Sequence, residues 1–336
     1  MDLMQSDEQN EIQRTVAAFL AEKMPVKGHG HDQARTAPEI SDELWAACCE
    51  LGWLGLGLPE SIGGVGYGLT EEAVLFREIG RGVAPGPFLP GVLSGHVAAA
   101  AGDAGLVQRI VSGEVRVAMA TPTGATPDAQ TFSGELSLVH SEEATHALVV
   151  SHQGSAIYSM DEISARAVDS VDMSLSIASG MASGAKAVHF VSGDAIYRRA
   201  LVLSAAISVG LALEVMRIAV EYSKVREQFG KSIGSFQALK NYAAYMAARC
   251  ELAESQLFFA ALAVEGNFEN ALGEALTARY TATEAARLNS EHAIQMHGGY
   301  GYTTEYMPYR FATRAHVVER MIAVRPQVLD ELVRSS

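Results

Sequence analysis

The residues with the clearest chemical potential form a short polar turn between two apolar stretches, Arg226-Glu227-Gln228-Phe229-Gly230-Lys231. An arginine such as Arg226 can hold a pyrophosphate through two parallel charge-assisted hydrogen bonds. An aromatic residue such as Phe229 can lie against a planar ring, and Gln228 adds an amide beside it. The alternative is a polar loop between helices in which Phe229 fills the core. A short motif alone does not decide between the two.

A second candidate segment lies further along the chain, Gln295-Met296-His297-Gly298-Gly299-Tyr300-Gly301-Tyr302. Glycines such as Gly298 and Gly299 permit a positive φ and a close approach of the backbone to a ligand. Glycine is also the ordinary end of a helix, so this pattern is weak by itself. It is not a Walker loop, which requires Gly-Lys-Ser/Thr, and no strand precedes it as in a Rossmann turn. His297 fits a helix cap or a packing residue better than a catalytic base.

Other chemistries find little support in the sequence. The histidine pair His29 and His31 lies in a Gly-rich stretch without the thiol or carboxylate cluster of a metal site, so we expect no metal. No Gly-x-Ser-x-Gly elbow of a serine hydrolase occurs. Cys48, Cys49 and Cys250 lack the C-x-x-C spacing of a zinc site and cannot form a disulfide framework. A reduced, cytoplasmic compartment fits this cysteine usage best.

Long helices are needed to position the candidates, and apolar periodicity predicts such helices in two regions. The C-terminal region is Ala-rich, with helices expected at 195–224, 236–265, 270–296 and 308–333. Four helices joined by short loops are typical of an antiparallel bundle. The middle region alternates polar and apolar residues in short runs, which predicts a small antiparallel sheet. We therefore expect a mostly α protein with an N-terminal helical domain (1–115), a middle β-domain (116–192) and a C-terminal four-helix bundle (193–336).

Composition narrows the class of protein. Of the 336 residues, 39 are Asp or Glu and 25 are Lys or Arg, which gives a net charge of −14. We expect no nucleic-acid partner, because neutralising phosphates needs a basic surface. No window reaches the ~18 uninterrupted apolar residues of a membrane span, so we expect no membrane partner either. A hydrophobic content of 49% excludes a disordered chain.

Taken together, the two candidate segments resemble motifs of the acyl-CoA dehydrogenase family. The matching stretches are YSKVREQFGKSIGSFQALKNYAA at 222–244 and AIQMHGGYGYTTEY at 293–306, and 54–82 also looks like the N-terminal domain of the family. The resemblance implies a tetramer. It also implies an FAD between the middle domain and the bundle of one subunit, with its ADP half touched by a neighbour. Carried over by match, the cofactor contacts are Arg226 at the pyrophosphate, Gln228 and Phe229 at the FAD, and Gln295, Gly298 and Gly299 at the adenosine–pyrophosphate end.

The reaction implied by the resemblance is α,β-dehydrogenation of an acyl-CoA, followed by passage of the electrons to an electron-transfer acceptor. In the family a glutamate removes the α-proton, and the β-hydrogen leaves as hydride to the flavin. Counting from the Gly-rich turn places that glutamate near Ile322, but 320–324 hold no carboxylate and Glu319 is the nearest candidate. The alternative base position of the family falls near Ala200, where Asp194 is the nearest carboxylate.

The middle domain departs from the family as well. The tryptophan that flanks the flavin ring is missing, and Thr121-Pro122-Thr123-Gly124-Ala125-Thr126 is at best a remnant of the usual ring-binding motif. We therefore expect a subunit that contributes FAD contacts while a second, complete subunit supplies the ring site and the base. Short members of this kind resemble one half of the heterotetrameric enzymes that shorten bulky side chains such as those of sterols. The alternatives are a self-sufficient homotetrameric dehydrogenase with Glu319 as a displaced base, and a non-catalytic scaffold subunit.

Overall fold

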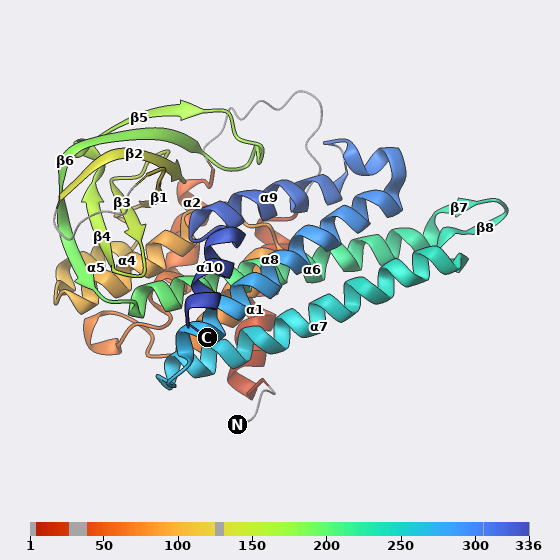
Figure 1. Ribbon diagram of the computed structural model, residues 1–336, viewed down its shortest axis with the longest axis horizontal. Coiled ribbons are helices and arrows are strands. Elements are labelled where there is room, and N and C mark those ends of the chain that lie inside the picture. Colours follow the sequence, from red (N-terminus) through yellow and green to blue (C-terminus); the bar gives the residue numbers. More distant parts are fainter. Residues whose placement is uncertain (1–4, 27–38, 125–130, 305, 336) are drawn as a thin grey trace.

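The chain folds into an elongated molecule with a β-sheet at one end and long helices that run away from it (Figure 1). The computed structural model describes residues 5–26, 39–124, 131–304 and 306–335. The N-terminal helices are α1 (Asp7–Lys23), α2 (Asp42–Glu50), α3 (Leu69–Arg81), α4 (Phe88–Ala100) and α5 (Ala104–Val111). The side chains of Ser6 and Ser41 accept hydrogen bonds from the first turns of α1 and α2, which satisfies backbone donors that a helix start leaves free.

Helix α3 packs against the long helix α6 (Ala195–Val225) at a crossing made of glycines. A Cβ at Gly80 would lie 2.1 Å from the carbonyl oxygen of Ile207, and one at Gly210 would lie 1.9 Å from that of Arg77. Neither distance is possible for a real side chain, so glycine is required on both helices. This crossing fixes the N-terminal helices on the C-terminal bundle.

The middle strands are β1 (Val117–Pro122), β2 (Thr131–Val139), β3 (His146–Val150), β4 (Gly154–Ser159), β5 (Ile163–Val168) and β6 (Ile177–Ser192). They form a six-stranded sheet in the order β2-β1-β3-β4-β6-β5, and an additional pairing of β2 with β6 closes it into a small barrel. Small inward residues such as Ala118, Ala120, Ala147 and Ala156 leave room in its core for Phe132 and Tyr158. The expectation of a purely antiparallel sheet is wrong for one pair, because β1 and β3 run parallel.

The C-terminal helices are α6, α7 (Gln237–Glu265), α8 (Ala271–His297), α9 (Met307–Met321) and α10 (Arg325–Ser335). A short hairpin of β7 (Glu227–Gln228) and β8 (Lys231–Ser232) joins α6 to α7, and a 3-10 turn, η5 (Gly298–Tyr302), follows α8. The single helix expected at 308–333 is wrong, because the chain breaks between α9 and α10. Pro326 lacks a backbone N–H, and its ring excludes a helical carbonyl at Ile322, whose φ of −118° and ψ of −76° are already irregular.

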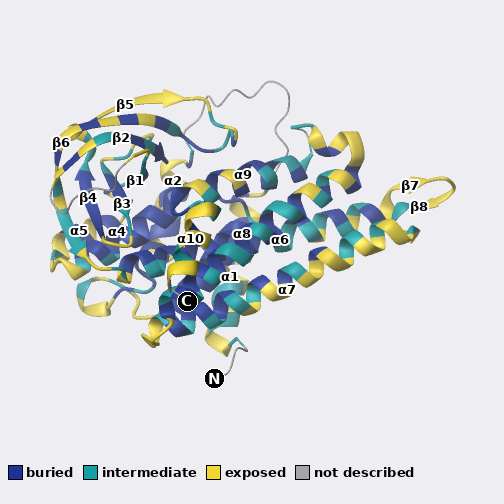
Figure 2. Cartoon of the chain, in the orientation of Figure 1, coloured by how far each residue is buried: buried dark blue, intermediate teal, exposed yellow. Residues whose placement is uncertain are grey.

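Helix α6 belongs to the core of the bundle, and its half next to the sheet is almost entirely buried (Figure 2). By length and composition it could cross a membrane, but 72% of its most apolar window is buried inside the protein. Its apolar character therefore reflects burial against α3 and α8.

Candidate functional site

The arginine-led turn is the β7–β8 hairpin. Its strands pair Glu227 with Ser232 and Gln228 with Lys231, which leaves Phe229 and Gly230 as a two-residue tip with φ of 55° and 80°. Positive φ at both central positions is the geometry of a type I′ turn, where an aromatic residue in the first position is strained. The Phe229 side chain is 91% exposed, so in this chain it does not fill the core.

Aromatic and cationic side chains cluster around this tip. The rings of Phe229 and Phe236 meet edge to face at 6.1 Å, and the Lys231 ammonium lies 4.4 Å from the centre of the Phe236 ring. Arg226, at the start of the hairpin, is exposed. Strain that persists at an exposed aromatic tip is typical of a surface kept for binding rather than for folding.

The glycine-laden turn presents open space. Gly298 ends α8 with a φ of 64°, and a Cβ at either Gly298 or Gly299 would meet nothing within 4 Å. Gly301 differs, because a Cβ there would lie 2.6 Å from the carbonyl oxygen of Ile294. The packing of this chain therefore requires a glycine at Gly301, whereas Gly298 and Gly299 leave a bare backbone facing outward beside the exposed Gln295.

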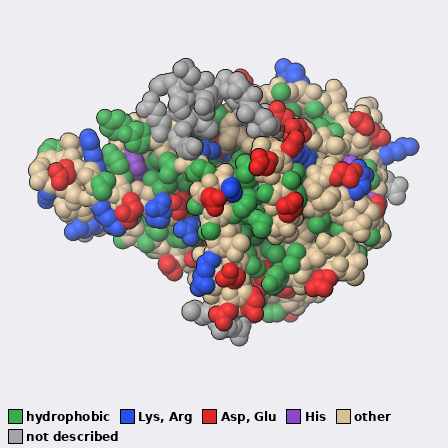
Figure 3. Space-filling view, turned by 180° about the vertical axis from the view of Figure 1, so that it is seen from behind, with side chains coloured by type: hydrophobic (Ala, Val, Ile, Leu, Met, Phe, Trp, Pro, Cys, Tyr) green, Lys and Arg blue, Asp and Glu red, His purple; other side chains and the backbone are tan. Residues whose placement is uncertain are grey.

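Both turns lie at the end of the bundle that is remote from the sheet (Figure 1). Their roots touch, because the rings of Tyr222 and His297 stack at 4.0 Å with an interplanar angle of 17°. Arg226 follows Tyr222 by one helical turn and donates its backbone N–H to the Tyr222 carbonyl at 2.9 Å. Lys and Arg side chains gather at this end, at the left of Figure 3, on a molecule that is acidic overall.

A cavity of about 470 Å³ adjoins the base of the hairpin. Its polar lining consists of two lysines and three serines, which are Lys224, Lys240, Ser223, Ser232 and Ser235. Ammonium and hydroxyl groups are donors that phosphate oxygens accept. Gln295, Gly298 and Gly299 do not line this cavity, so in the single chain the two turns are neighbours without sharing one described pocket.

The residues of this end fit the ADP half of an FAD by their chemistry. The guanidinium of Arg226 is a group of the kind that binds a pyrophosphate, and the backbone at Gly298 and Gly299 is open enough for a ligand to come close. At the other end of the chain, the middle domain meets the C-terminal helices. There the Thr121 hydroxyl donates to the carbonyl oxygens of Arg320 and Met321, at 3.3 Å and 3.1 Å, so the end of β1 rests directly on the end of α9.

The expected base positions hold no free carboxylate among the described residues. Ile322 and Ala200 are buried, at 8% and 0% exposure. Asp194 pairs with Arg198 at 3.0 Å. Glu319 accepts a hydrogen bond from Arg325 Nε at 2.9 Å. The cavity that Glu319 lines between α8 and α9 measures about 30 Å³, which is room for about one water. Its role as a base stays a prediction.

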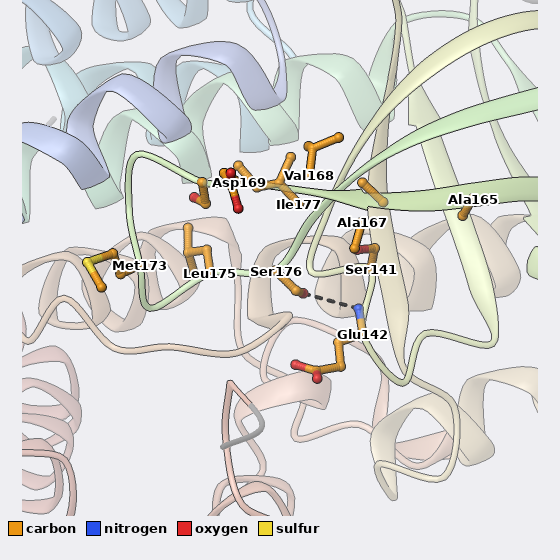
Figure 4. Close-up of a pocket in the computed structure, with 12 residues that line it drawn as sticks. Ser141, Glu142, Ala165, Ala167, Val168, Asp169, Met173, Leu175, Ser176 and Ile177 are labelled. Atoms are coloured by element: carbon orange, nitrogen blue, oxygen red, sulfur yellow. Dashed lines mark hydrogen bonds between the residues drawn. The ribbon is translucent and has the colours of Figure 1, made fainter. Parts of the chain in front are cut away.

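Another cavity, of about 700 Å³, lies in the β-domain between the β5–β6 loop and the segment after β2 (Figure 4). The Glu142 backbone N–H donates to the Ser176 hydroxyl at 3.1 Å across its floor. Its described lining includes the carboxylates of Glu142 and Asp169 and no Lys or Arg. Repulsion from these carboxylates makes this cavity unsuitable for the phosphates of a nucleotide.

Some predicted features fall outside the described residues. His29, His31, Ala125 and Thr126 are among these, so the structure gives no account of the histidine pair or of the second half of the ring-motif remnant. Within the described part of the chain, no group of three or more His, Cys, Asp or Glu is arranged to hold a metal ion. His297 behaves as the packing residue that the sequence predicts, since it stacks on Tyr222 and donates from Nδ1 to the Ala293 carbonyl at 2.7 Å.

Comparison with known proteins defines the class. The acyl-CoA dehydrogenase C-terminal domain matches residues 197–321, and the N-terminal domain of the same family matches 6–112. Acyl-CoA dehydrogenase IpdE2 of Mycobacterium tuberculosis is 28% identical over 334 residues, which cover 97% of this chain and 96% of that protein. Acyl-CoA dehydrogenase FadE34 of the same organism is 31% identical over 280 residues, 81% of this chain, but the chain spans only 39% of its length.

A solved structure described as the Tcur3481-Tcur3483 steroid ACAD G363A variant superposes with a TM-score of 0.85. It is 25% identical, and the match covers 98% of this chain and 97% of that one. The chain belongs to the acyl-CoA dehydrogenase family of flavoprotein oxidoreductases. Its helical N-terminal region, central β-domain and C-terminal helices are the fold of that family, whose members typically use FAD.

Proposed function

We propose that the chain is one subunit of an FAD-dependent acyl-CoA dehydrogenase. In this proposal it contributes contacts to the ADP half of the cofactor, and a partner subunit of different sequence supplies the flavin-ring site and the catalytic base. The observation that carries the proposal is an asymmetry. At one end of the bundle, the proposed binding groups are accessible; these are Arg226, Phe229, Gly298 and Gly299. At the other end, the expected position of the base holds Ile322, which is apolar and buried.

Distance within the chain supports a shared cofactor. The hairpin and the glycine turn point away from the chain's own β-domain (Figure 1), so a cofactor bound there would meet the β-domain of another chain. Helix α7 offers a surface for such a chain, because its outer side is exposed (Figure 2). Tyr245 and Leu252 on this helix are 61% and 62% exposed, and Ala244, Ala247 and Ala248 lie beside them.

Each residue has one task in this arrangement. Arg226 neutralises and orients the pyrophosphate, and Gln228 and Gln295 offer amides to the nucleotide. Phe229 packs on the cofactor as an apolar surface, while Gly298 and Gly299 let the backbone approach. FAD, when bound, supplies the acceptor for the hydride that leaves the β-carbon of the acyl-CoA. The electrons then pass to an electron-transfer acceptor in the cytoplasm, where the three buried cysteines stay thiols.

We propose a bulky acyl-CoA, such as one with a sterol-derived side chain, as the substrate. The support is the similarity to the solved structure described as the Tcur3481-Tcur3483 steroid ACAD G363A variant. A self-sufficient homotetramer with Glu319 as the base is the alternative, favoured by the low exposure of that side chain at 14%. The ion pair with Arg325 opposes it, because Arg325 already occupies one of the two carboxylate oxygens of Glu319.

The test is to produce the chain alone and together with its genomic neighbour, and to measure bound flavin, native mass and oxidation of acyl-CoA. We expect flavin and turnover from the pair. Full activity of the single chain, lost in Glu319→Gln, would establish the homotetramer instead.

Arg226→Ala in the pair should weaken FAD binding by about 10- to 100-fold, because a charge-assisted contact contributes about 1.5–3 kcal/mol. The matched control is Arg217→Ala, which removes an exposed arginine of the preceding helix α6 that pairs with Glu214. Arg226→Lys should lie in between, since a lysine cannot make the bidentate contact. Unchanged flavin content in Arg226→Ala would support a scaffold subunit and refute the proposal.

A further inference from the structure

The stacked pair of Tyr222 and His297 occupies the place where the bundle core ends. Ala219 is the last residue of α6 with 0% exposure, and beyond it in this helix only Ser223 is still buried. Most of the residues from Glu221 onward are exposed. His297 is only 5% exposed, and its Nδ1–H donates to the Ala293 carbonyl, which fixes the orientation of the ring. Burial lowers the pKa of His297 and outweighs that hydrogen bond, so the ring is neutral in the stack at neutral pH.

Each ring is tied by the backbone to one of the two turns. Tyr222 holds Arg226 through the last helical hydrogen bond of α6, and the Ile233 N–H returns to the Arg226 carbonyl at 2.8 Å. Gly234 packs the base of the hairpin closely against α6. A Cβ at this position would lie 2.9 Å from the Ser223 carbonyl oxygen, so a side chain would push the two segments apart. On the other side, His297 directly precedes Gly298. A shift of one ring relative to the other would therefore change the distance between the two turns.

We propose that the Tyr222–His297 stack is a positioning contact that holds the arginine turn and the glycine turn at the spacing needed to bind one ADP group. The inference rests on the proposed function and adds to it two residues that do not touch the cofactor. The stack acts through Arg226 on one helix and through Gly298 on the other. Its loss leaves every direct binding group in place but lets the two turns move independently.

A second aromatic–histidine pair provides a matched control. Tyr242 of α7 and His292 of α8 meet at 4.7 Å with an interplanar angle of 35°, and Arg249 also contacts His292 at 3.1 Å. This pair joins helices of the same bundle, but it is tied to neither turn by a direct backbone bond. Tyr242→Leu should lower thermal stability to a similar degree as Tyr222→Leu without altering cofactor affinity.

The experiment uses the co-produced complex and measures the FAD dissociation constant from the fluorescence of released flavin. Tyr222→Leu and His297→Leu should each weaken FAD binding by about 3- to 10-fold, the range expected for one aromatic pair. Tyr222→Phe and His297→Phe keep a stacked ring and should stay within about twofold of the native value. With FAD saturating, the KM for acyl-CoA should be unchanged. The double variant should be no weaker than either single one, since both remove the same contact.

Unchanged FAD affinity in Tyr222→Leu would overturn the inference, as would an equal loss in the Tyr242→Leu control, which would indicate general loosening of the bundle. Failure of rescue by Tyr222→Phe would also overturn it, because the hydroxyl rather than the stack would then matter. Arg226→Ala separates the two proposals. If it also leaves FAD bound, the proposed function fails, whereas loss in Arg226→Ala alone refutes only the positioning role.

Discussion

Phe229 keeps a backbone conformation that an aromatic residue rarely adopts, with a φ of 55° and a side chain that is 91% exposed. A left-handed conformation costs about 1–2 kcal/mol for a residue with a Cβ. The single chain offers no compensating burial of the ring, which touches Phe236 only edge to face. The compensation we expect is the cofactor or a neighbouring chain that covers the hairpin.

Phe229→Asn tests whether Phe229 is strained in the isolated chain and is kept for its contact in the complex. Asn-Gly is the preferred pair for a type I′ turn, so the isolated chain should gain about 1 kcal/mol in its free energy of unfolding. The same variant should lose FAD affinity in the complex, because the aromatic surface is gone. Denaturant unfolding and flavin retention are the two measurements. Phe229→Leu keeps the strain and an apolar side chain, and it should show no gain in stability; a gain there would contradict the strain argument.

At the scale of elements, helix α9 ties three parts of the chain together through Arg314. Its Nε donates to Asp172 at 2.5 Å and its Nη2 to the Ser174 hydroxyl at 2.8 Å, both in the loop before β6. Its Nη1 donates to the Ala84 carbonyl at 2.9 Å, between α3 and α4. The ion pair of Arg314 with Asp172 is buried, since the two side chains are 5% and 2% exposed. Removing either partner therefore leaves the other charge buried without a counter-charge.

Asp172→Asn should lower the free energy of unfolding by about 3–5 kcal/mol, since Arg314 is left without its counter-charge. Burial alone would raise the pKa of Asp172, but the Arg314 charge and the hydrogen bonds from Ser174 and Arg314 lower it on balance. A lowered folded pKa contributes stability that is present above the usual value of 3.8 and is lost as pH falls below it.

Unfolding curves of the variant should consequently vary less with pH in this acid range than those of the native chain. Asp330→Asn is the control, because Asp330 and Arg334 are 58% and 76% exposed and contribute little. An equal acid dependence in Asp172→Asn and the native chain would show that the pair does not titrate as described.

At the scale of the whole molecule, the exposed face of α7 and the hairpin end form one side of the bundle that the chain itself does not cover (Figure 2). Leu252 lies in the middle of α7 and is 62% exposed, so a charge there is compatible with the fold of the single chain. A charge buried between subunits would be costly.

Leu252→Glu should therefore leave the melting temperature of the isolated chain nearly unchanged but lower the native mass of the complex and its bound flavin. Size-exclusion chromatography with light scattering measures the mass. The control is Val188→Glu on β6, which is 44% exposed and lies in the β-domain. If Leu252→Glu assembles normally, the partner does not cover this face of α7.

Local sequence patterns were enough to predict the elements that depend on neighbours along the chain. Apolar periodicity located α6, α7 and α8 within one or two residues, and polar–apolar alternation placed the strands in the middle region. The apolar periodicity did not reveal the break between α9 and α10 at 322–324, because apolar residues recur at helical spacing on both sides of it. Only Pro326 marks this break in the sequence. Strand β5 alternates as Ile-Ser-Ala-Arg-Ala-Val, but five of its six residues are exposed, so it pairs at the edge of the sheet without burying an apolar face.

Features that depend on residues far apart in the sequence became visible only in the folded chain. The motif residues Arg226, Phe229 and Gly298 were recognisable as types, but their exposure at the bundle end remote from the sheet was not. The stack of Tyr222 on His297, like the partner of Glu319, follows from the crossing of helices, and a linear pattern does not contain helix orientation or rotamers. The spacing of residues along the chain therefore indicates the kind of chemistry, here nucleotide binding. Which side chains face solvent, which are paired and which stay accessible to a cofactor depends on the packing of the helices.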